Sequence, residues 1–435
     1  MFKKILGTIF SKGLVTIVSF ITLLLTTHIL GAQGRGDAIV ITTAVGLMGL
    51  VNDFIGGSSL VYLIPKQKNS WYFTHVLLFS LVGAVIVSIL GTIVFKFGFF
   101  MVSGYWKYVF IIGLLTCIYS SILILILGYE DIRNYNLVGV FQPILTLCFF
   151  AGASLLGYGR VSTYIYSLGL SYLITIVMMI IMLRKIQKKL KRKSVKLGSL
   201  IILTEMISLG SVAQLGNLIQ YLNYRFSYFV IDAHIGASGV GIYSVAVKIS
   251  ESIWLIAQSI SLVQYTTITN SHDDKYSINL TIKLVKLSFV ITTFLIILLI
   301  IIPGSLFGLI FGKDFSPIRI VLIYLSPGVI ALGVGLILSH YFSGKGNYLV
   351  NTIGAFIGLC VSIPGCFLLI PGHGYLGAAA TASIAYLVTV FYQMAVFINT
   401  TKVKIIDFKF NNNDWQQVSM ILNKIKKQKR ESSLL

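Results

Sequence analysis

The chain has 435 residues, of which 56% are hydrophobic and 11% are charged, and its mean hydropathy is +0.90. Soluble globular proteins carry about 25% charged residues, so this composition excludes a water-soluble fold, and the long apolar runs exclude a disordered chain. The net charge of +21 would suit a nucleic-acid-binding protein. In a chain this apolar, however, basic residues are expected to collect in cytoplasmic loops, so we predict a polytopic membrane protein and no nucleic-acid partner.

Apolar runs long enough to cross a bilayer recur along the chain. A helix needs about 20 apolar residues to span the hydrocarbon core, and the runs are too evenly apolar for the alternating strands of a membrane barrel. Twelve runs meet this length, and they predict an all-α fold with twelve transmembrane helices. The runs lie near 10–30, 38–64, 76–95, 108–127, 137–156, 161–183, 204–230, 240–266, 287–311, 320–342, 349–370 and 375–398.

The basic residues predict the domain organisation and the topology. A basic segment divides the spans six and six, so we expect an N-terminal lobe over 1–183, a cytoplasmic linker over 184–200, a C-terminal lobe over 201–400 and a basic cytoplasmic tail over 401–435. Most of the 34 Lys and Arg residues fall on one side of the membrane if both termini are cytoplasmic, which is the usual bias. The first apolar run is too long for the core of a signal peptide, so the first span is expected to be retained. The amphipathic tail is predicted either to lie on anionic lipid headgroups or to be solvated.

The two predicted lobes carry a weak internal repeat. At an offset of 205, Gly31, Gly34 and Gly36 fall on Gly236, Gly239 and Gly241, which follow the first and seventh spans. Shorter matches precede the fifth and eleventh spans and the sixth and twelfth spans. Because each copy has an even number of spans, both copies have the same orientation, which is a transporter architecture with the substrate site between the lobes.

Polar side chains inside the spans are the candidate substrate-binding residues, because ionisable groups in a membrane are costly and usually functional. Arg225 and Lys248 are the two basic residues inside spans, and an arginine presents a bidentate fork to phosphate. The alternative is structural pairing of Arg225 with Asp232, and of Lys248 with Glu251. The cavity-lining residues that we predict are Arg225, Lys248, Gln220, Asn217, Tyr221 and Tyr224. Some of the polar stripe on the seventh span is expected to serve only as hydrogen bonds between helices.

Two carboxylates are candidates for ion coupling. Asp53 lies in the second span and Glu251 in the eighth, and a desolvated carboxylate can bind a proton or Na⁺. For Asp53 a hydrogen-bonded structural role near a glycine-broken helix is an equal alternative. We expect no catalytic residues, no metal site and no cofactor other than a coupling ion, H⁺ or Na⁺.

Several segments also resemble the polysaccharide flippases of the MOP superfamily, the Wzx-type exporters of O-antigen and capsule repeat units. The resemblance lies in the turn at 30–36, the start of the eighth span at 239–246, the turn at 311–315 and the start of the last helix at 374–379. It implies a central cavity between two six-helix lobes and alternating access. It also implies the substrate, an oligosaccharide linked to undecaprenyl pyrophosphate and carried to the periplasmic face of the bacterial inner membrane.

The predicted function is therefore a flippase of such lipid-linked oligosaccharides, coupled to H⁺ or Na⁺, rather than an enzyme. A polysaccharide polymerase complex is the expected protein partner. A multidrug extruder of the same superfamily is the alternative, although Arg225 and Lys248 argue against cationic drugs. A membrane-embedded polymerase or glycosyltransferase is a further alternative, but the predicted outside loops are short. A fourteen-helix lipid II flippase and a scaffold without transport are less favoured.

Overall fold

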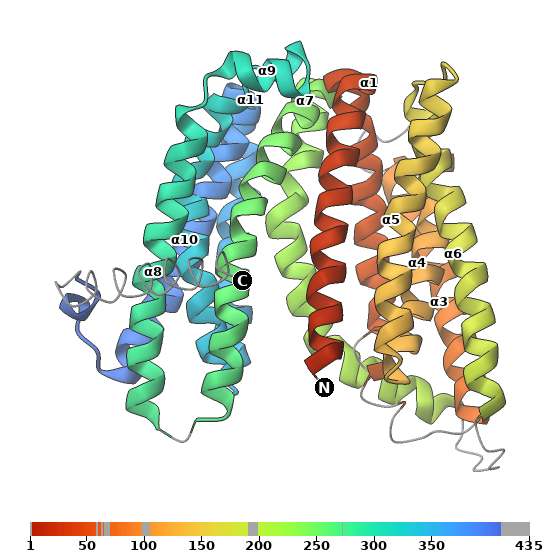
Figure 1. Ribbon diagram of the computed structural model, residues 1–435, viewed down its shortest axis with the longest axis horizontal. Helices are drawn as coiled ribbons and strands as arrows, with labels where there is room; N and C mark the ends of the chain where they lie inside the picture. Colours follow the sequence, from red (N-terminus) through yellow and green to blue (C-terminus); the bar gives the residue numbers. More distant parts are fainter. Residues whose placement is uncertain are drawn as a thin grey trace, which may run out of the picture. The chain divides into compact units, whose positions relative to one another are not determined.

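The computed structural model describes residues 2–57, 60–61, 64, 70–97, 105–189, 199–271 and 273–409. All regular structure in these residues is helical, which confirms the all-α prediction (Figure 1). Nine helices of the described part are long and apolar enough to cross a membrane, so the chain is a multi-pass membrane protein. The helices are α1 (Phe2–Gly56), α3 (Ser70–Phe97), α4 (Trp106–Gly128), α5 (Ile132–Leu155), α6 (Val161–Lys189), α7 (Ser199–Thr269), α8 (Asp274–Ile301), α9 (Gly304–Phe311), α10 (Ile318–Gly344) and α11 (Tyr348–Thr401), with two short 3₁₀ turns, η3 (Lys313–Phe315) and η4 (Ile405–Phe408).

Three of the nine long helices in the described part are interrupted at a glycine, and the count of twelve spans stays a prediction. A continuous helix of the length of α1, 55 residues, would extend about 80 Å, far beyond the ~30 Å hydrocarbon core. Helical geometry is interrupted in α1 at Gly31, in α7 at Gly236 and in α11 at Gly374, with φ of 63°, 78° and 57°. Only glycine adopts this left-handed region without cost. The chain turns back at the first break, at the top of the red helix in Figure 1.

The helix boundaries differ from the predicted spans at one place in particular. The apolar run at 287–311 was expected to be one span, but α8 ends at Ile301 and the short α9 follows Pro303. Proline lacks the backbone N–H that continues a helix, so the run is split although its hydropathy is continuous. The helix instead begins earlier than the run, at Asp274.

Two compact units make up the chain and are described separately. Unit 1 comprises Met1–Lys248, Ile302–Tyr324 and Leu359–Ala382, and unit 2 comprises Ile249–Ile301, Leu325–Gly358 and Ser383–Leu435. The division into lobes at 1–183 and 201–400 stays a prediction. Residues 190–198 of the predicted linker and 410–435 of the predicted tail lie outside the described residues.

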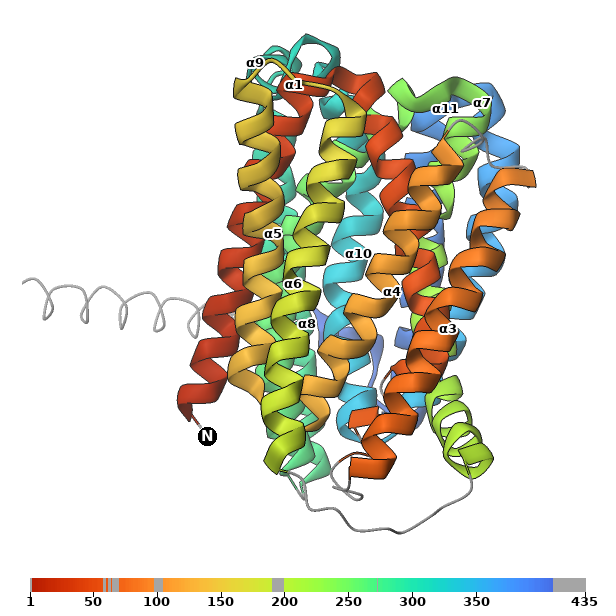
Figure 2. The same cartoon turned by 90° about the vertical axis from the view of Figure 1, so that its right-hand side faces the viewer.

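Helices α1, α3, α4, α5 and α6 pack together in unit 1 (Figure 2). Because lipid is as apolar as the side chains, packing and hydrogen bonds between helices must hold such a bundle. One such hydrogen-bond group joins α5 to α6: Gln142 Nε2 donates to Ser171 Oγ at 3.0 Å, and Thr146 Oγ1 lies 2.7 Å from the same oxygen. The buried core beside it consists of Leu60, Ile64, Val76, Ile122, Leu125, Ile126, Val138, Ile176, Met179 and Leu183.

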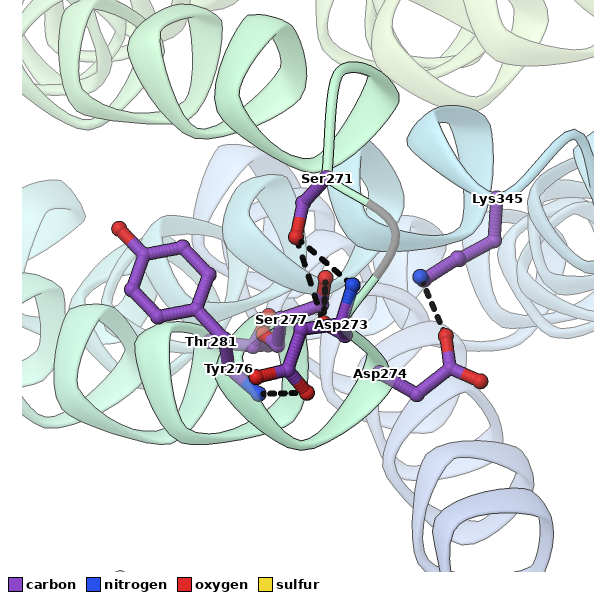
Figure 3. Close-up of polar contacts among 7 residues, drawn as sticks. All are labelled: Ser271, Asp273, Asp274, Tyr276, Ser277, Thr281 and Lys345. Carbon is purple, nitrogen blue, oxygen red and sulfur yellow. Dashed lines mark hydrogen bonds and ion pairs between the residues drawn. The ribbon is translucent and has the colours of Figure 1, made fainter.

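Unit 2 contains α8 and the part of α10 from Leu325 onward, and an ion pair joins one end of the two helices. Lys345 Nζ lies 2.6 Å from Asp274 Oδ1, just beyond the end of α10 and at the start of α8 (Figure 3). Asp273 caps the start of α8: its carboxylate accepts a hydrogen bond from the backbone N–H of Tyr276 at 3.1 Å. Its own backbone N–H donates to Ser271 Oγ at 3.2 Å. The Asp274 side chain is 81% exposed, so the ion pair contributes little stability.

Candidate functional site: an arginine–tyrosine cluster

The two copies of the sequence repeat meet in unit 1 through reciprocal backbone contacts. A Cβ on Gly36 would lie 1.7 Å from the carbonyl oxygen of Ala237, and a Cβ on Gly241 would lie 2.0 Å from that of Ala32. The repeat pairs Gly36 with Gly241 and Ala32 with Ala237 at the same offset of 205. Only glycine permits so close an approach, so the glycines of the repeat mark a helix crossing.

Arg35 is buried beside this crossing. Arg35 is 8% exposed, and its Nη1 donates a hydrogen bond to Thr26 Oγ1 at 3.0 Å. Its Nε has no hydrogen-bond partner among the described residues. The groups that act on its charge are the phenols of Tyr164 and Tyr228, not a carboxylate. A buried guanidinium normally has all of its donors satisfied, so Arg35 is a cation with donor capacity left over.

Arg225 lies on α7 and contacts Tyr228, one of the two tyrosines that act electrostatically on Arg35. Its Nη1 donates to the hydroxyl of Tyr228 at 2.9 Å, and its guanidinium carbon lies 5.4 Å from the centre of that ring. Tyr228 is 3% exposed, and its ring packs edge-on against Tyr243 at 5.6 Å. Tyr228 therefore accepts a hydrogen bond from Arg225 on α7 and interacts electrostatically with Arg35 on α1. We call Arg35, Arg225, Tyr164, Tyr221, Tyr228 and Tyr243 the arginine–tyrosine cluster.

Tyr221 connects the cluster to the second half of α1. Its hydroxyl donates to the carbonyl oxygen of Thr43 at 2.8 Å, and it interacts electrostatically with Arg225 and Tyr228. The phenol lies against Gly46, where a Cβ would be 2.4 Å from the hydroxyl oxygen. Tyr221 therefore has a positioning contact and also belongs to the predicted site.

The rest of the predicted polar stripe is divided between packing and surface. Asn217 is exposed, and its Nδ2 donates to Gln214 Oε1 at 3.1 Å, while Gln214 itself is buried. Gln220 and Tyr224 are half-buried on α7, and their role in a cavity stays a prediction. Lys248 is exposed and Glu251 is half-buried. They belong to different units, so neither the cavity role nor the predicted pairing is tested.

Asp53 lies in a second polar group, between α1 and α4. Ser120 Oγ donates to its Oδ1 at 3.3 Å. The preceding residue, Asn52, is fully buried and donates Nδ2 to Ser121 Oγ at 2.9 Å, while its Oδ1 has no hydrogen-bond partner among the described residues. Asp53 is thus hydrogen-bonded, as the structural alternative requires, and partly buried, as a coupling site requires.

Two carboxyl groups near the helix breaks were not among the predicted site residues. Asp37 accepts a 3.2 Å hydrogen bond from the hydroxyl of Tyr105 and interacts electrostatically with Asp232. Burial, and then the charge of Asp37, raise the pKa of Tyr105, which precedes α4. The pairing of Arg225 with Asp232, the structural alternative to a cavity role, stays a prediction.

The predicted spans 10–30 and 38–64 leave Arg35 in the turn between them, and Tyr228 was not among the predicted site residues. The structure places Arg35 inside α1, because only residue Gly31 interrupts the helix and the chain continues helically after it. The glycines at 31, 34 and 36 were a usable signal, since such a group around one arginine indicates close packing of the helix that carries it. Tyr228 had no such signal among many apolar neighbours.

The fold has solved relatives. No family model matches the chain. It is similar to an inward-facing multidrug resistance MATE family transporter of the MOP superfamily (TM-score 0.68, 15% identity, 88% of this chain and 94% of the relative) and to the lipid II flippase MurJ (TM-score 0.68, 17% identity, 97% and 96%). A MOP superfamily transporter from Pyrococcus furiosus, whose binding pocket is described as having reverse polarity, is also similar (TM-score 0.56, 14% identity, 92% of this chain and 94% of the relative).

A curated relative adds a partial match in sequence. The chain is 32% identical over 171 residues to the capsular polysaccharide biosynthesis protein CapF of Staphylococcus aureus. The match covers 38% of this chain and 43% of CapF, so the chain spans less than half the length of that relative. The structural matches cover nearly the whole of this chain and of each solved relative. The chain has the fold of the MOP superfamily transporters.

Proposed function

We propose that the chain is a flippase that carries an anionic, lipid-linked saccharide across the bacterial cytoplasmic membrane by alternating access. The substrate in this proposal is an oligosaccharide repeat unit linked to undecaprenyl pyrophosphate. The observation that carries it is the pair of arginines at Tyr228: Arg225 donates a hydrogen bond to its hydroxyl, and the buried Arg35 interacts with it electrostatically. Two guanidinium groups in a low-dielectric bundle attract a phosphate group strongly. Arg35 also has a donor, Nε, that none of the described residues uses.

The relatives support the same class of substrate. One relative with this fold is named a lipid II flippase, and the curated relative is named for capsular polysaccharide biosynthesis. The other solved relatives are transporters, which supports a transporter rather than a polymerase or glycosyltransferase. In this proposal each of the three broken helices supplies two spans, which makes twelve, arranged as two six-helix lobes with both termini in the cytoplasm.

The proposal assigns ion coupling to Asp53, with Glu251 as the second candidate. Asp53 is the better supported of the two, because its carboxylate and Ser120 lie in a group that also contains the Oδ1 of Asn52, for which the described residues supply no hydrogen-bond partner. Oxygen ligands and a carboxylate suit both a proton and Na⁺. Anionic lipids at the basic tail and a polysaccharide polymerase remain the proposed partners.

Arg225→Ala tests the function directly. In cells that lack their own exporter, the variant is expected to accumulate in the membrane at the parent level but to abolish export of the lipid-linked oligosaccharide. Arg160→Ala is the matched control, because Arg160 is exposed between α5 and α6. Normal surface polysaccharide with Arg225→Ala would contradict the proposal.

A multidrug extruder is the second candidate, favoured by the MATE relative and by the Asp37–Asp232 carboxyl pair, which would attract cations. The two functions differ in the sign of the ligand charge. Efflux of a cationic dye that is lost in Asp232→Asn and kept in Arg225→Ala would favour the extruder, and the opposite pattern for oligosaccharide export favours the flippase.

A further inference from the structure

An apolar groove lies in unit 1 between the second half of α1, α3 and α7. It has a volume of about 310 Å³ and is lined by aliphatic and aromatic side chains and Gly91, among them Met48, Leu90, Val94, Leu222 and Phe226. This volume is at the lower end of small-molecule pockets. It has room for a segment of a hydrocarbon chain rather than for a compact ligand.

The walls of the groove are held in place, while one edge is open. The Met48 side chain packs against Gly91 and Gly113. A Cβ on Gly91 would lie 2.4 Å from it, and a Cβ on Gly113 would lie 2.6 Å from it. The rings of Phe95 and Phe229 contact each other at 5.6 Å between centroids. On α3, Leu90 and Val94 are each 57% exposed, so a chain can enter from that side.

The groove and the arginine–tyrosine cluster share a stretch of α7. Leu222, Phe226 and Phe229 line the groove, whereas Tyr221, Arg225 and Tyr228 belong to the cluster. Spacings of three and four residues place each set along one side of a helix, and the two sets on neighbouring sides. A cationic patch and an apolar groove therefore adjoin each other at one level of α7.

The level of this stretch distinguishes between possible occupants. Arg225 precedes the break at Gly236 by eleven residues, which is about 16 Å along the helix and about half of the ~30 Å hydrocarbon core. The phosphate of an ordinary phospholipid stays at the membrane surface. A phosphate reaches the depth of Arg225 only while a headgroup is crossing the bilayer.

We propose that the groove holds the polyprenyl chain of the lipid-linked substrate while its pyrophosphate contacts Arg225 and Arg35. The inference rests on the proposed function and adds to it the site of the lipid part. An amphiphile with an anionic head and a long apolar tail matches both surfaces in charge and in polarity. The groove keeps the tail in contact with the protein at the stage when the head is farthest from water.

A photocrosslinking experiment tests the occupant. The full chain, with Leu90 replaced by the photoreactive residue benzoylphenylalanine, is reconstituted in phosphatidylethanolamine and phosphatidylglycerol vesicles that contain a minor fraction of undecaprenyl pyrophosphate. The same replacement at Ile93 is the control, because Ile93 is on the same helix and 49% exposed but does not line the groove. We expect adducts enriched in the polyprenyl lipid at position 90 and in proportion to membrane composition at 93. Phospholipid adducts in the same proportion at both positions would overturn the proposal.

A binding experiment separates the tail from the head. Leu90→Trp fills the groove and is expected to weaken undecaprenyl pyrophosphate binding about tenfold, the effect of displacing two methylene groups, without changing the affinity for inorganic pyrophosphate. Ile93→Trp should change neither. A parent chain that binds neither probe contradicts the proposed function itself. If the parent chain binds both probes, and Leu90→Trp and Ile93→Trp have the same affinity for undecaprenyl pyrophosphate, only the assignment of the tail to the groove is contradicted.

Discussion

Gly36 lies with its Cα against the carbonyl oxygen of Ala237, and the equivalent contact of the second repeat joins Gly241 to Ala32. The two contacts are reciprocal, as expected where two similarly folded segments pack about a local twofold axis. The crossing explains why Arg35 is buried. Arg35 directly precedes Gly36, so the close packing at Gly36 places the arginine inside the bundle as well.

A methyl group at this crossing should be poorly tolerated. Gly36→Ala places a Cβ 1.7 Å from the Ala237 oxygen, and overpacking of this kind costs about 3 kcal/mol. We expect a clear fall in the thermal unfolding midpoint of the detergent-purified protein. Gly139→Ala is the control, because a Cβ there meets nothing within 4 Å, and it should leave the midpoint unchanged or slightly raised. Equal midpoints for the two variants would show that the crossing is looser than described.

Anion binding by Arg35 predicts a ligand-dependent stability. Inorganic pyrophosphate at 100 times its dissociation constant should stabilise the parent chain by about 2.7 kcal/mol. In Arg35→Met, which keeps most of the side-chain volume without the charge, this stabilisation should be lost. Thermal unfolding with and without pyrophosphate measures it. The same pyrophosphate-induced shift in both proteins would mean that Arg35 does not contact the anion.

The hydroxyl of Tyr228 is predicted to position Arg225. Tyr228→Phe removes the oxygen that accepts the 2.9 Å hydrogen bond of Arg225 and keeps the ring, so we expect pyrophosphate affinity to fall about tenfold, the effect of one hydrogen bond to a charged group. Tyr166→Phe is the matched control, because Tyr166 is 64% exposed on α6. Calorimetric titration of both variants distinguishes a positioning role from a general effect of removing a phenol.

Coupling through Asp53 predicts a change in gradient dependence. Asp53→Asn should remove the response of oligosaccharide transport to an imposed H⁺ or Na⁺ gradient in vesicles, because the amide cannot carry the charge that binds the ion. Ser120→Ala removes only the 3.3 Å hydrogen bond to Asp53 and should keep the gradient response. A gradient response that survives in Asp53→Asn would transfer the coupling role to Glu251 or exclude it.

The exposed ion pair of unit 2 should matter little for stability. Asp274→Ala and Lys345→Ala, measured singly and together, are expected to give a coupling energy of at most about 1 kcal/mol, because the Asp274 side chain is 81% exposed. Chemical unfolding of the purified protein supplies the three differences. A coupling of several kcal/mol would require that this end of α8 is shielded from solvent.

Hydropathy predicted the helical membrane fold correctly because a bilayer leaves few alternatives: apolar runs must form helices, and positions such as Gly31 and Gly236 show where they end. The same signal failed at Pro303, since hydropathy does not record a missing N–H. It also left Arg35 outside the predicted spans 10–30 and 38–64, whereas the break at Gly31 occupies a single residue and the helix resumes before the arginine is reached.

The amino-acid sequence by itself determined the class of the protein, the glycine repeat and the candidate role of Arg225, all of which depend on composition and local spacing. The tertiary structure alone decided that Arg35 is buried near the tyrosine to which Arg225 donates a hydrogen bond, and that an apolar groove lines the same stretch of α7. The Tyr221–Thr43 hydrogen bond, for example, joins residues 178 positions apart. Packing of this kind depends on the close backbone approach at Gly36 and Gly241, which no local pattern specifies.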